Sequence, residues 1–233
     1  MNRSKAIQED NIQWFQQQLL VWADRNFRDF PWRHTQDPYA IFAAECLLQK
    51  TTALQAERTY RQFLATYPTI DALAQAEIAD LTELLRPLGM TFRAARFLAA
   101  AQMVANTYGG KFPETETELL KLPGVGKYVA RSILANALGQ ATAVLDRNVA
   151  RILERFFGVE GGRVKTRDPM LWDLSQQVAP TASVSRWNLT LIDFGAAVCT
   201  ARQPGCQDCP LQERCCWVSG GNDIPDEPSS NPA

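Results

Sequence analysis

The sequence lacks any apolar run long enough to cross a membrane. None of its hydrophobic stretches approaches the roughly 20 residues that a bilayer-spanning helix needs, although hydrophobic residues make up 46% of the 233-residue chain. The segment 1–15 is too polar for a signal peptide, so we expect a cytoplasmic protein with no membrane partner. A chain of this length buries enough surface for one or two compact lobes.

A large net charge is also absent. The formal charge of -1 excludes a broad basic surface of the kind that covers nucleic acid non-specifically. The positive charge is nevertheless concentrated, because residues 121–170 hold nine Lys and Arg against four Asp and Glu. Such a segment fits a local phosphate contact, although a solvated helical face explains the charges equally well.

Alternating polar and apolar residues, the pattern of a half-buried strand, are limited to a few positions. Apolar residues instead recur at helical spacing, which predicts an all-α fold of about ten short helices. The final segment, 217–233, is rich in Gly, Pro, Ser and acidic residues, and we expect it to be disordered. The predicted helix starts are Asp37–Pro38, Thr91 and Asp168–Pro169, and the predicted stops are Gly139 and Gly158.

Four of the six cysteines lie in one short segment, Cys199, Cys206, Cys209 and Cys215, with six, two and five residues between neighbours. Disulfides are not expected without a secretory signal. Four thiolates suit a structural zinc ion, but zinc ribbons usually have two Cys-x-x-Cys pairs and this segment has one. The compact spacing fits a 4Fe-4S cluster at least as well. Cys46 lies outside the pattern and is expected to be a small buried hydrophobic residue.

A glycine-rich turn, "LPGVGKY", joins two helical stretches at residues 122–128. A helix–hairpin–helix of this kind leaves backbone N–H groups uncovered beside a helix N-terminus, where a phosphate oxygen binds. The spacing differs from that of a P-loop, and no strand precedes the turn. A tight turn between helices with no ligand is the alternative.

Two carboxylates are candidates for catalysis. Asp146 precedes an amphipathic helix, where it is a natural N-cap and where the helix dipole keeps a carboxylate ionised. An ionised carboxylate can stabilise an oxocarbenium-like sugar. Glu45 falls on a mostly apolar helix, so it is either a buried acid with a raised pKa or a residue on the solvent side.

These motifs together resemble the helix–hairpin–helix DNA glycosylases of the endonuclease III superfamily. The resemblance is carried by "LPGVGKY", by "LDRNV" eighteen residues further on, by "LIDFGAAVCTARQPGCQDCP", and by "FPWRHTQDPYAIFAAECLLQKTT". It implies two helical lobes with a DNA-binding cleft between them. One lobe is 29–140, ending in the hairpin, and the other combines 1–28 with 141–198. The segment 199–216 then holds the 4Fe-4S cluster.

The resemblance also implies roles for individual residues. Asp146 matches the family's catalytic aspartate. Members that also cleave the strand have their Schiff-base lysine at the position of Tyr128, whereas Lys127, one residue earlier, points about 100° away on a helix. We therefore expect hydrolysis of the N-glycosidic bond, with AP-lyase activity weak or absent.

Two branches of the family remove mismatched bases without a lyase step. Both branches share the Glu at Glu45 and often the Tyr at Tyr128, and thymine-DNA mismatch glycosylases also have the following "TTA". Adenine-DNA glycosylases share "WR…DPY", but they carry a further C-terminal domain, a tyrosine at Met90 and a glycine at Arg147. We therefore favour a monofunctional enzyme of base excision repair that acts on thymine or uracil opposite guanine. The alternative is adenine opposite guanine or oxidised guanine.

The expected partner is double-stranded DNA with a mismatched or damaged base, bound by a nucleoid-associated monomer. We expect the hairpin amides of Val125 and Lys127 to hold a phosphate, Glu45 to contact the flipped base, and Tyr128 to line its pocket. A non-catalytic DNA-binding protein with a structural metal site is the rival class. The remaining predicted DNA contacts are Gln49, Lys50, Thr51, Met90, Leu122, Gly124 and Gly126.

Overall fold

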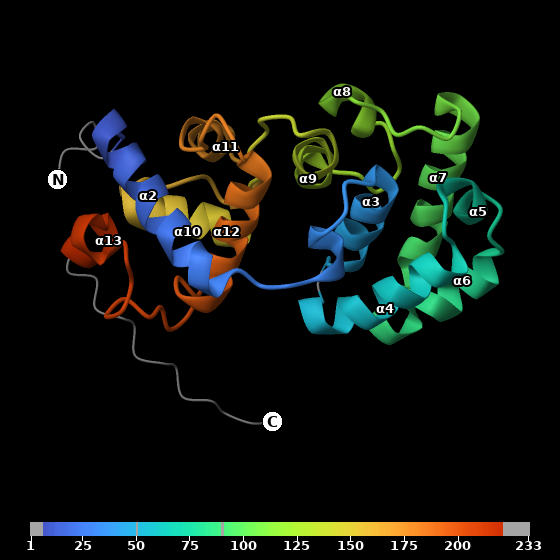
Figure 1. Cartoon of the computed structure of the whole chain (residues 1–233), viewed down its shortest axis with the longest axis horizontal. Helices are drawn as coiled ribbons and strands as arrows, with labels where there is room; N and C mark the ends of the chain where they lie inside the picture. The colour runs from blue at the N-terminus through green and yellow to red at the C-terminus, as the bar shows by residue number, and fades with distance from the viewer. Residues whose placement is uncertain (1–6, 50, 90, 221–233) are drawn as a thin grey trace. The chain divides into compact units, whose positions relative to one another are not determined.

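The computed structural model describes residues 7–49, 51–89 and 91–220, and every regular element in these ranges is helical (Figure 1). The predicted all-α fold class is therefore confirmed. Two compact units share the chain. Residues 29–142 form the middle unit, and residues 1–28 and 143–233 form the terminal unit. No helix among the described residues is both long enough and apolar enough to span a membrane.

The middle unit is built around α3 (Pro38–Leu47), in which every side chain from Tyr39 to Leu47 is buried. This helix packs against α9 (Lys127–Leu138) and α4 (Ala53–Thr66). Its apolar sequence, "PYAIFAAECL", requires such cover on all sides. The other elements are η1 (Pro31–Arg33), α5 (Ile70–Ala74), α6 (Ile78–Leu85), η2 (Arg86–Leu88), η3 (Thr91–Arg93), α7 (Ala94–Tyr108) and α8 (Glu116–Leu119).

The terminal unit packs α2 (Glu9–Asn26) and α10 (Arg147–Phe157) against α12 (Val184–Ala197). Its core is aromatic: the Phe15 ring lies 4.6 Å from that of Phe156 and 5.7 Å from that of Trp187, centroid to centroid. All three side chains are fully buried. The remaining elements are η4 (Lys165–Arg167), α11 (Pro169–Gln177), η5 (Gln212–Arg214) and α13 (Cys216–Ser219).

Most predicted helix boundaries agree with the structure. Asp37 and Asp168 cap α3 and α11 through their side chains, and Gly139 and Gly158 end α9 and α10 in the left-handed conformation. Near Thr91 the chain first makes the 3-10 turn η3, so the α-helix begins only at Ala94.

The segment predicted to be disordered, 217–233, begins inside a helix. Its first three residues belong to α13, which packs against α10. The apolar pair Trp217 and Val218 explains this difference, because both side chains line the pocket formed by the cysteine segment. Residues 221–233 lie outside the described part of the chain.

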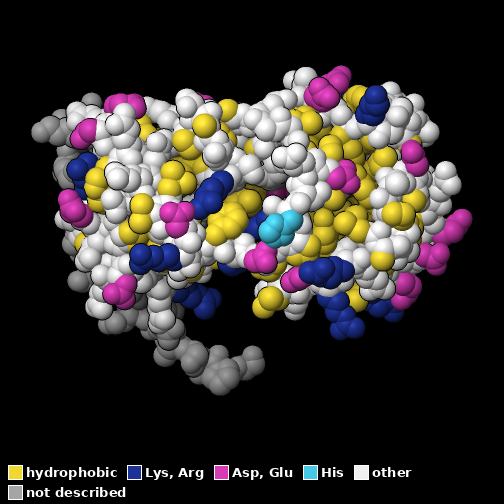
Figure 2. All heavy atoms as spheres, viewed as in Figure 1, with side chains coloured by type: hydrophobic (Ala, Val, Ile, Leu, Met, Phe, Trp, Pro, Cys, Tyr) yellow, Lys and Arg dark blue, Asp and Glu magenta, His cyan; other side chains and the backbone are white. Residues whose placement is uncertain are grey.

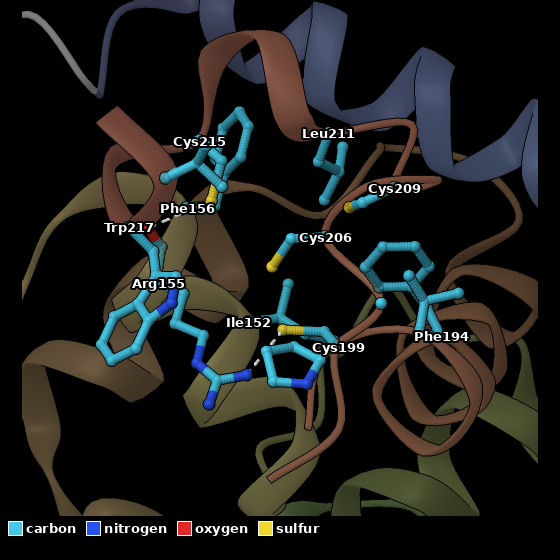
Figure 3. Close-up of a pocket in the computed structure, with 14 residues that line it drawn as sticks. Ile152, Arg155, Phe156, Phe194, Cys199, Cys206, Cys209, Leu211, Cys215 and Trp217 are labelled. Carbon is cyan, nitrogen blue, oxygen red and sulfur yellow. Dashed lines mark hydrogen bonds between the residues drawn. The ribbon is translucent and has the colours of Figure 1, made fainter. Parts of the chain in front are cut away.

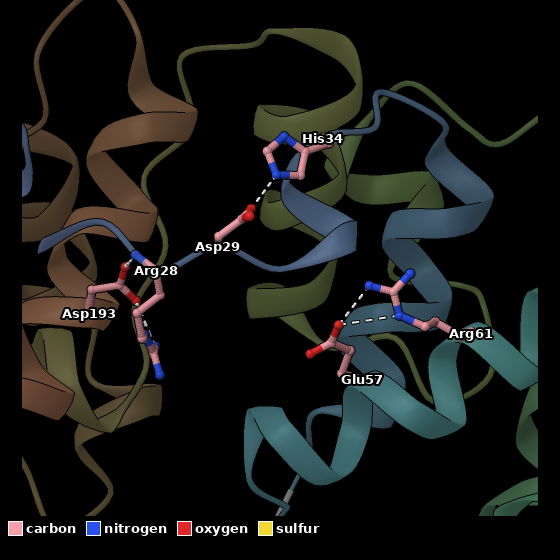
Figure 4. A network of polar contacts seen from close by, with 6 residues as sticks. All are labelled: Arg28, Asp29, His34, Glu57, Arg61 and Asp193. Carbon is pink, nitrogen blue, oxygen red and sulfur yellow. Dashed lines mark hydrogen bonds and ion pairs between the residues drawn. The ribbon is translucent and has the colours of Figure 1, made fainter.

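The N-terminal segment of the terminal unit is fixed at its last residue, Arg28. The buried carboxylate of Asp193, on α12, accepts hydrogen bonds from the Arg28 backbone N–H at 3.0 Å and from its Nε at 2.6 Å (Figure 4). A charge-assisted pair of this kind is stronger than a neutral hydrogen bond. It holds the chain at the boundary between the two units.

Candidate functional site

The predicted hairpin is present in the middle unit between α8 and α9. Leu122 and Val125 turn their side chains into the core, and the Val125 N–H donates to the Leu122 carbonyl at 3.0 Å. Gly124 has a φ of +85°, a conformation that residues with a Cβ rarely adopt. Gly126 is the N-cap of α9, with an extended backbone and no side-chain cap.

The hydrogen bond inside this turn corrects one prediction. The Val125 amide is used by the turn itself, so it is not a phosphate donor. In the described part of the chain, the N–H groups of Gly124 and Gly126 have no acceptor, and both residues are exposed. These two amides are therefore donors that the turn offers to a ligand, and the phosphate contact of the Lys127 amide stays a prediction.

The shape of the turn at Gly126 also favours a ligand. A Cβ placed on this residue would meet no atom within 4 Å, and its φ of -100° is open to any amino acid. The protein's own packing therefore does not require glycine here. Close approach by a bound group is a physical reason for a glycine at such a position.

Glu45 is buried, with 8% of its surface exposed, which excludes the alternative that it faces solvent. Its Oε1 accepts a hydrogen bond from the Ser132 hydroxyl on α9, and that hydroxyl accepts one from Asn136 Nδ2 at 2.9 Å. Two helices thus hold the carboxyl group. Its neighbour Cys46 is buried as predicted, and burial raises the pKa of the Cys46 thiol.

Tyr128 occupies the second position of α9, and its side chain packs against the core of the middle unit. Lys127, the first residue of the helix, is half-buried. Gln49 and Thr51 lie in the connection between α3 and α4, where the Gln49 carbonyl accepts a hydrogen bond from Arg93 at 3.4 Å. The other predicted contacts in these loops, Lys50 and Met90, lie outside the described residues.

Asp146 is the N-cap of α10 in the terminal unit. Its Oδ1 accepts the Val149 N–H at 2.8 Å, and its Oδ2 accepts Asn148 Nδ2 at 3.0 Å. Burial raises the pKa of Asp146, and these hydrogen bonds, with the charge of Arg151, offset only part of that effect. The expectation that the helix N-terminus keeps this carboxylate easily ionised is therefore wrong in direction, because desolvation outweighs the dipole.

A hydrogen-bonded chain connects Asp146 to the cysteine segment. Asn148, which donates to Asp146, accepts from Arg151 Nη2 at 2.8 Å through its Oδ1. Arg151 also donates to the Gly195 carbonyl at 2.8 Å and, through Nε, to the Cys199 carbonyl at 2.7 Å. The orientation of the aspartate therefore depends on where the cysteine segment holds its first residue.

The four predicted metal ligands line one pocket of the terminal unit (Figure 3). Apolar side chains of α10, α12 and α13 form much of the wall, and Arg155 donates to the Thr200 carbonyl at 2.7 Å and to Cys199 Sγ at 3.5 Å. The Arg155 guanidinium also lies 4.8 Å from the Trp217 ring. The pocket is lined by Cys199, Cys206, Cys209 and Cys215, with Ile152, Phe156, Phe194 and Leu211 among its apolar residues.

This environment disfavours free thiolates. Burial raises the pKa of the Cys209 thiol to about 12, and it also raises the pKa values of Cys206 and Cys215, with further increases from the neighbouring thiols. Four sulfur ligands in an apolar pocket require a bound cation or cluster if they are to be ionised together. Among the described residues, however, no three or more His, Cys, Asp or Glu side chains are grouped so that they could hold a metal ion.

Charged side chains of both signs are scattered over the face shown in Figure 2. This distribution agrees with the near-zero net charge of the sequence. A polyanion therefore meets individual cationic groups on this face and not one broad basic patch. Binding of a polyanion therefore depends more on the local geometry of the hairpin than on the overall charge of this face.

Sequence reasoning missed three residues that support the candidate site. Ser132 gives no signal of its own, because its role depends on α3 lying against α9. Asn148 lies within the quoted motif "LDRNV". Arg151 falls four residues after Arg147 and before Arg155, a spacing that places the three on one helical face.

The comparisons with known proteins agree with this geometry. Residues 43–178 match the HhH-GPD superfamily base excision DNA repair protein family. The thymine-DNA glycosylase of Aeropyrum pernix is 38% identical over 221 residues, 93% of this chain and 96% of that protein. The human adenine DNA glycosylase is 35% identical over 211 residues, 86% of this chain and 39% of that protein.

Solved structures show the same fold. A thermostable thymine-DNA glycosylase superposes with a TM-score of 0.83 at 31% identity, covering 90% of this chain and 97% of that one. An endonuclease III in a non-covalent DNA complex superposes with a TM-score of 0.76 at 20% identity, covering 91% of this chain and 97% of that one.

Proposed function

Because this chain belongs to the HhH-GPD superfamily of base excision DNA repair proteins, we propose that it is a monofunctional DNA glycosylase that removes thymine or uracil opposite guanine. The observation that carries the chemistry is the Asp146 carboxylate, held on both oxygens at the start of α10. The substrate follows from the 38% identical thymine-DNA glycosylase. Adenine opposite guanine or oxidised guanine is the second candidate, since adenine DNA glycosylases reach 35% identity.

Binding begins at the hairpin. The exposed N–H groups of Gly124 and Gly126 donate to a phosphate of double-stranded DNA, and the N-terminus of α9 adds a favourable dipole. This contact positions the enzyme without reading sequence. The mismatched nucleotide then leaves the stack, because a mispaired base is less costly to extrude than a paired one.

Asp146 acts on the sugar. As the N-glycosidic bond lengthens, positive charge develops on the deoxyribose ring, and the carboxylate stabilises it. The hydrogen bonds from Val149 and Asn148 fix the carboxylate, so little reorganisation is needed during the reaction. The same group orients the attacking water and accepts its proton.

Glu45 acts on the base. Its carboxyl group, buried and hydrogen-bonded to Ser132, contacts the departing base and favours its release through a hydrogen bond or a proton. Tyr128 fills the position at which a strand-cleaving relative has its lysine. The lysine that would form a Schiff base is replaced at this position, and the expected product is an abasic site.

The four-cysteine pocket is proposed to hold a 4Fe-4S cluster. Four thiols that line one pocket, with an arginine beside them, fit a polynuclear cluster. The preference for a cluster over a single zinc ion rests on the spacing of the cysteines, which form one Cys-x-x-Cys pair and not two. When bound, the cluster would supply a cross-link that fixes the segment 199–216.

A panel of duplexes tests the substrate. The protein is incubated with G·T, G·U, oxidised-G·A, G·A and thymine-glycol pairs, and abasic sites are then cleaved with alkali. We expect strand breaks at G·T and G·U only. Breaks confined to the adenine pairs would establish the second candidate, and no breaks on any duplex would leave the non-catalytic DNA-binding class.

Borohydride tests the absence of a lyase step. Reduction during turnover traps an enzyme that is joined to DNA through an imine, so we expect no covalent adduct with the wild-type protein. Efficient trapping would show that Lys127 or another amine acts as a nucleophile.

A further inference from the structure

The first turn of α7 lies directly against the glycine turn of the hairpin. A Cβ placed on Gly124 would meet the Cβ of Arg96 at 3.5 Å and its Cδ at 3.7 Å. The aliphatic stem of Arg96 therefore crosses the turn, and the residue is exposed to solvent. A cationic group thus accompanies the two amides that the hairpin offers to a phosphate.

The charge of Arg96 is available to a partner. Among the described residues it makes no hydrogen bond or ion pair. It also contributes, after burial, to lowering the pKa of Arg93 by repulsion. Other arginines of the middle unit are neutralised by carboxylates: Arg61 by Glu57, Arg86 by Glu83 and Arg131 by Glu116.

Phe92 lies in η3, the 3-10 turn directly before α7, four residues before Arg96. Its side chain is 63% exposed, so one face of this large aromatic ring remains open to a ligand. Arg93, between them, donates to the Gln49 carbonyl at 3.4 Å, and its guanidinium lies 5.2 Å from the Phe92 ring. The segment is therefore anchored to the neighbouring loop while Phe92 and Arg96 are left exposed.

We propose that Phe92 and Arg96 form a second DNA contact beside the hairpin. This inference rests on the proposed function of the hairpin as a phosphate site. The Arg96 guanidinium pairs with a backbone phosphate next to the one that the amides of Gly124 and Gly126 hold, since its planar fork matches phosphate oxygens. Phe92 enters the minor groove as an apolar wedge and helps to unstack the target base.

The salt dependence of binding tests the arginine. Each phosphate neutralised by a cation adds about 0.9 to the slope of log affinity against log salt concentration. Anisotropy titrations use a duplex with an abasic-site analogue, which binds without any base release. We expect Arg96→Gln to lower the slope by about 0.9, so that its affinity defect shrinks about threefold between roughly 50 and 200 mM salt.

Two matched variants make the result specific. Lys111→Gln removes another exposed charge with no hydrogen bond or ion pair among the described residues, three residues beyond the C-terminal end of α7. The helix itself separates Arg96 from that end by about 18 Å, and we expect the slope of Lys111→Gln to remain that of the wild type. Gly126→Ser crowds the amide site without removing a cation, so it should weaken binding at an unchanged slope. An unchanged slope in Arg96→Gln overturns the arginine contact, as does an equal decrease of the slope in Lys111→Gln.

The fluorescence of 2-aminopurine beside the mismatch tests the wedge, because this base brightens when it is unstacked. We expect Phe92→Ala to reduce the brightening and the single-turnover rate several-fold at an unchanged salt slope, and Phe92→Leu to retain most of both. Wild-type behaviour in Phe92→Ala refutes the wedge.

The duplex panel separates this inference from the proposed substrate. A wild-type protein that releases no base, combined with a lowered slope in Arg96→Gln, refutes the substrate and keeps the second contact. A wild-type protein that releases base, combined with an unchanged slope in Arg96→Gln, supports the substrate and refutes the second contact.

Discussion

Gly195 lies where α12 crosses α10, and its replacement by alanine gives a prediction in which two effects oppose each other. Alanine in a helix interior is normally more stable than glycine by about 1 kcal/mol. A Cβ on Gly195, however, would lie 2.5 Å from the Cβ of Asn148 and 3.2 Å from its Cα. Overpacking of this kind costs about 1–3 kcal/mol, and backbone at the contact cannot move aside cheaply.

We therefore expect Gly195→Ala to lower the free energy of unfolding by up to about 2 kcal/mol, the difference between these effects. The displaced Asn148 also weakens its 3.0 Å hydrogen bond to Asp146, so base release should slow about tenfold or more. Urea unfolding and single-turnover release at saturating enzyme measure the two quantities.

Ala196→Gly, at the exposed neighbouring position, serves as the control because it reports helix propensity without any contact to Asn148. It should be less stable than the wild type and fully active. A Gly195→Ala protein that is more stable than the wild type and releases base at the normal rate would refute the close crossing of α10 and α12.

Three further variants test other parts of the site. Asp146→Asn should bind duplex normally but release base about a hundredfold more slowly or worse. Because burial raises the Asp146 pKa, the wild-type free energy of unfolding falls as pH rises above about 4. The variant caps the helix equally well, so in denaturant titrations it should be more stable than the wild type at neutral pH and lose this advantage below about pH 4. Ser132→Ala removes the hydroxyl that donates to buried Glu45 and should cost about 1–3 kcal/mol in urea unfolding, whereas Asn136→Ala, one contact further away, should cost less; equal costs would contradict the direct role of Ser132. Cys209→Ser should abolish the brown colour and broad visible absorbance of anaerobically purified protein, while Cys216→Ser, outside the predicted ligand set, should keep them; a colourless wild-type protein that contains zinc would refute the cluster.

Much of the fold could be read from local patterns. Asp37–Pro38 and Asp168–Pro169 mark helix starts because capping and proline geometry act within a few residues. Gly139 and Gly158 mark stops for the same reason. The start near Thr91 was predicted too early, because the chain first makes the 3-10 turn η3 and the α-helix begins at Ala94.

The candidate site likewise combines residues that the sequence pattern identifies and contacts that only the fold creates. The sequence by itself identified the hairpin, Asp146, Glu45 and the four cysteines, since their chemistry and spacing are visible along the chain. Only the tertiary structure decided that Ser132 donates to Glu45 and that burial raises the Asp146 pKa. Hydrogen-bond partners and desolvation depend on groups that are distant in sequence, as when Arg151 donates to the Cys199 carbonyl. No local pattern can contain that information.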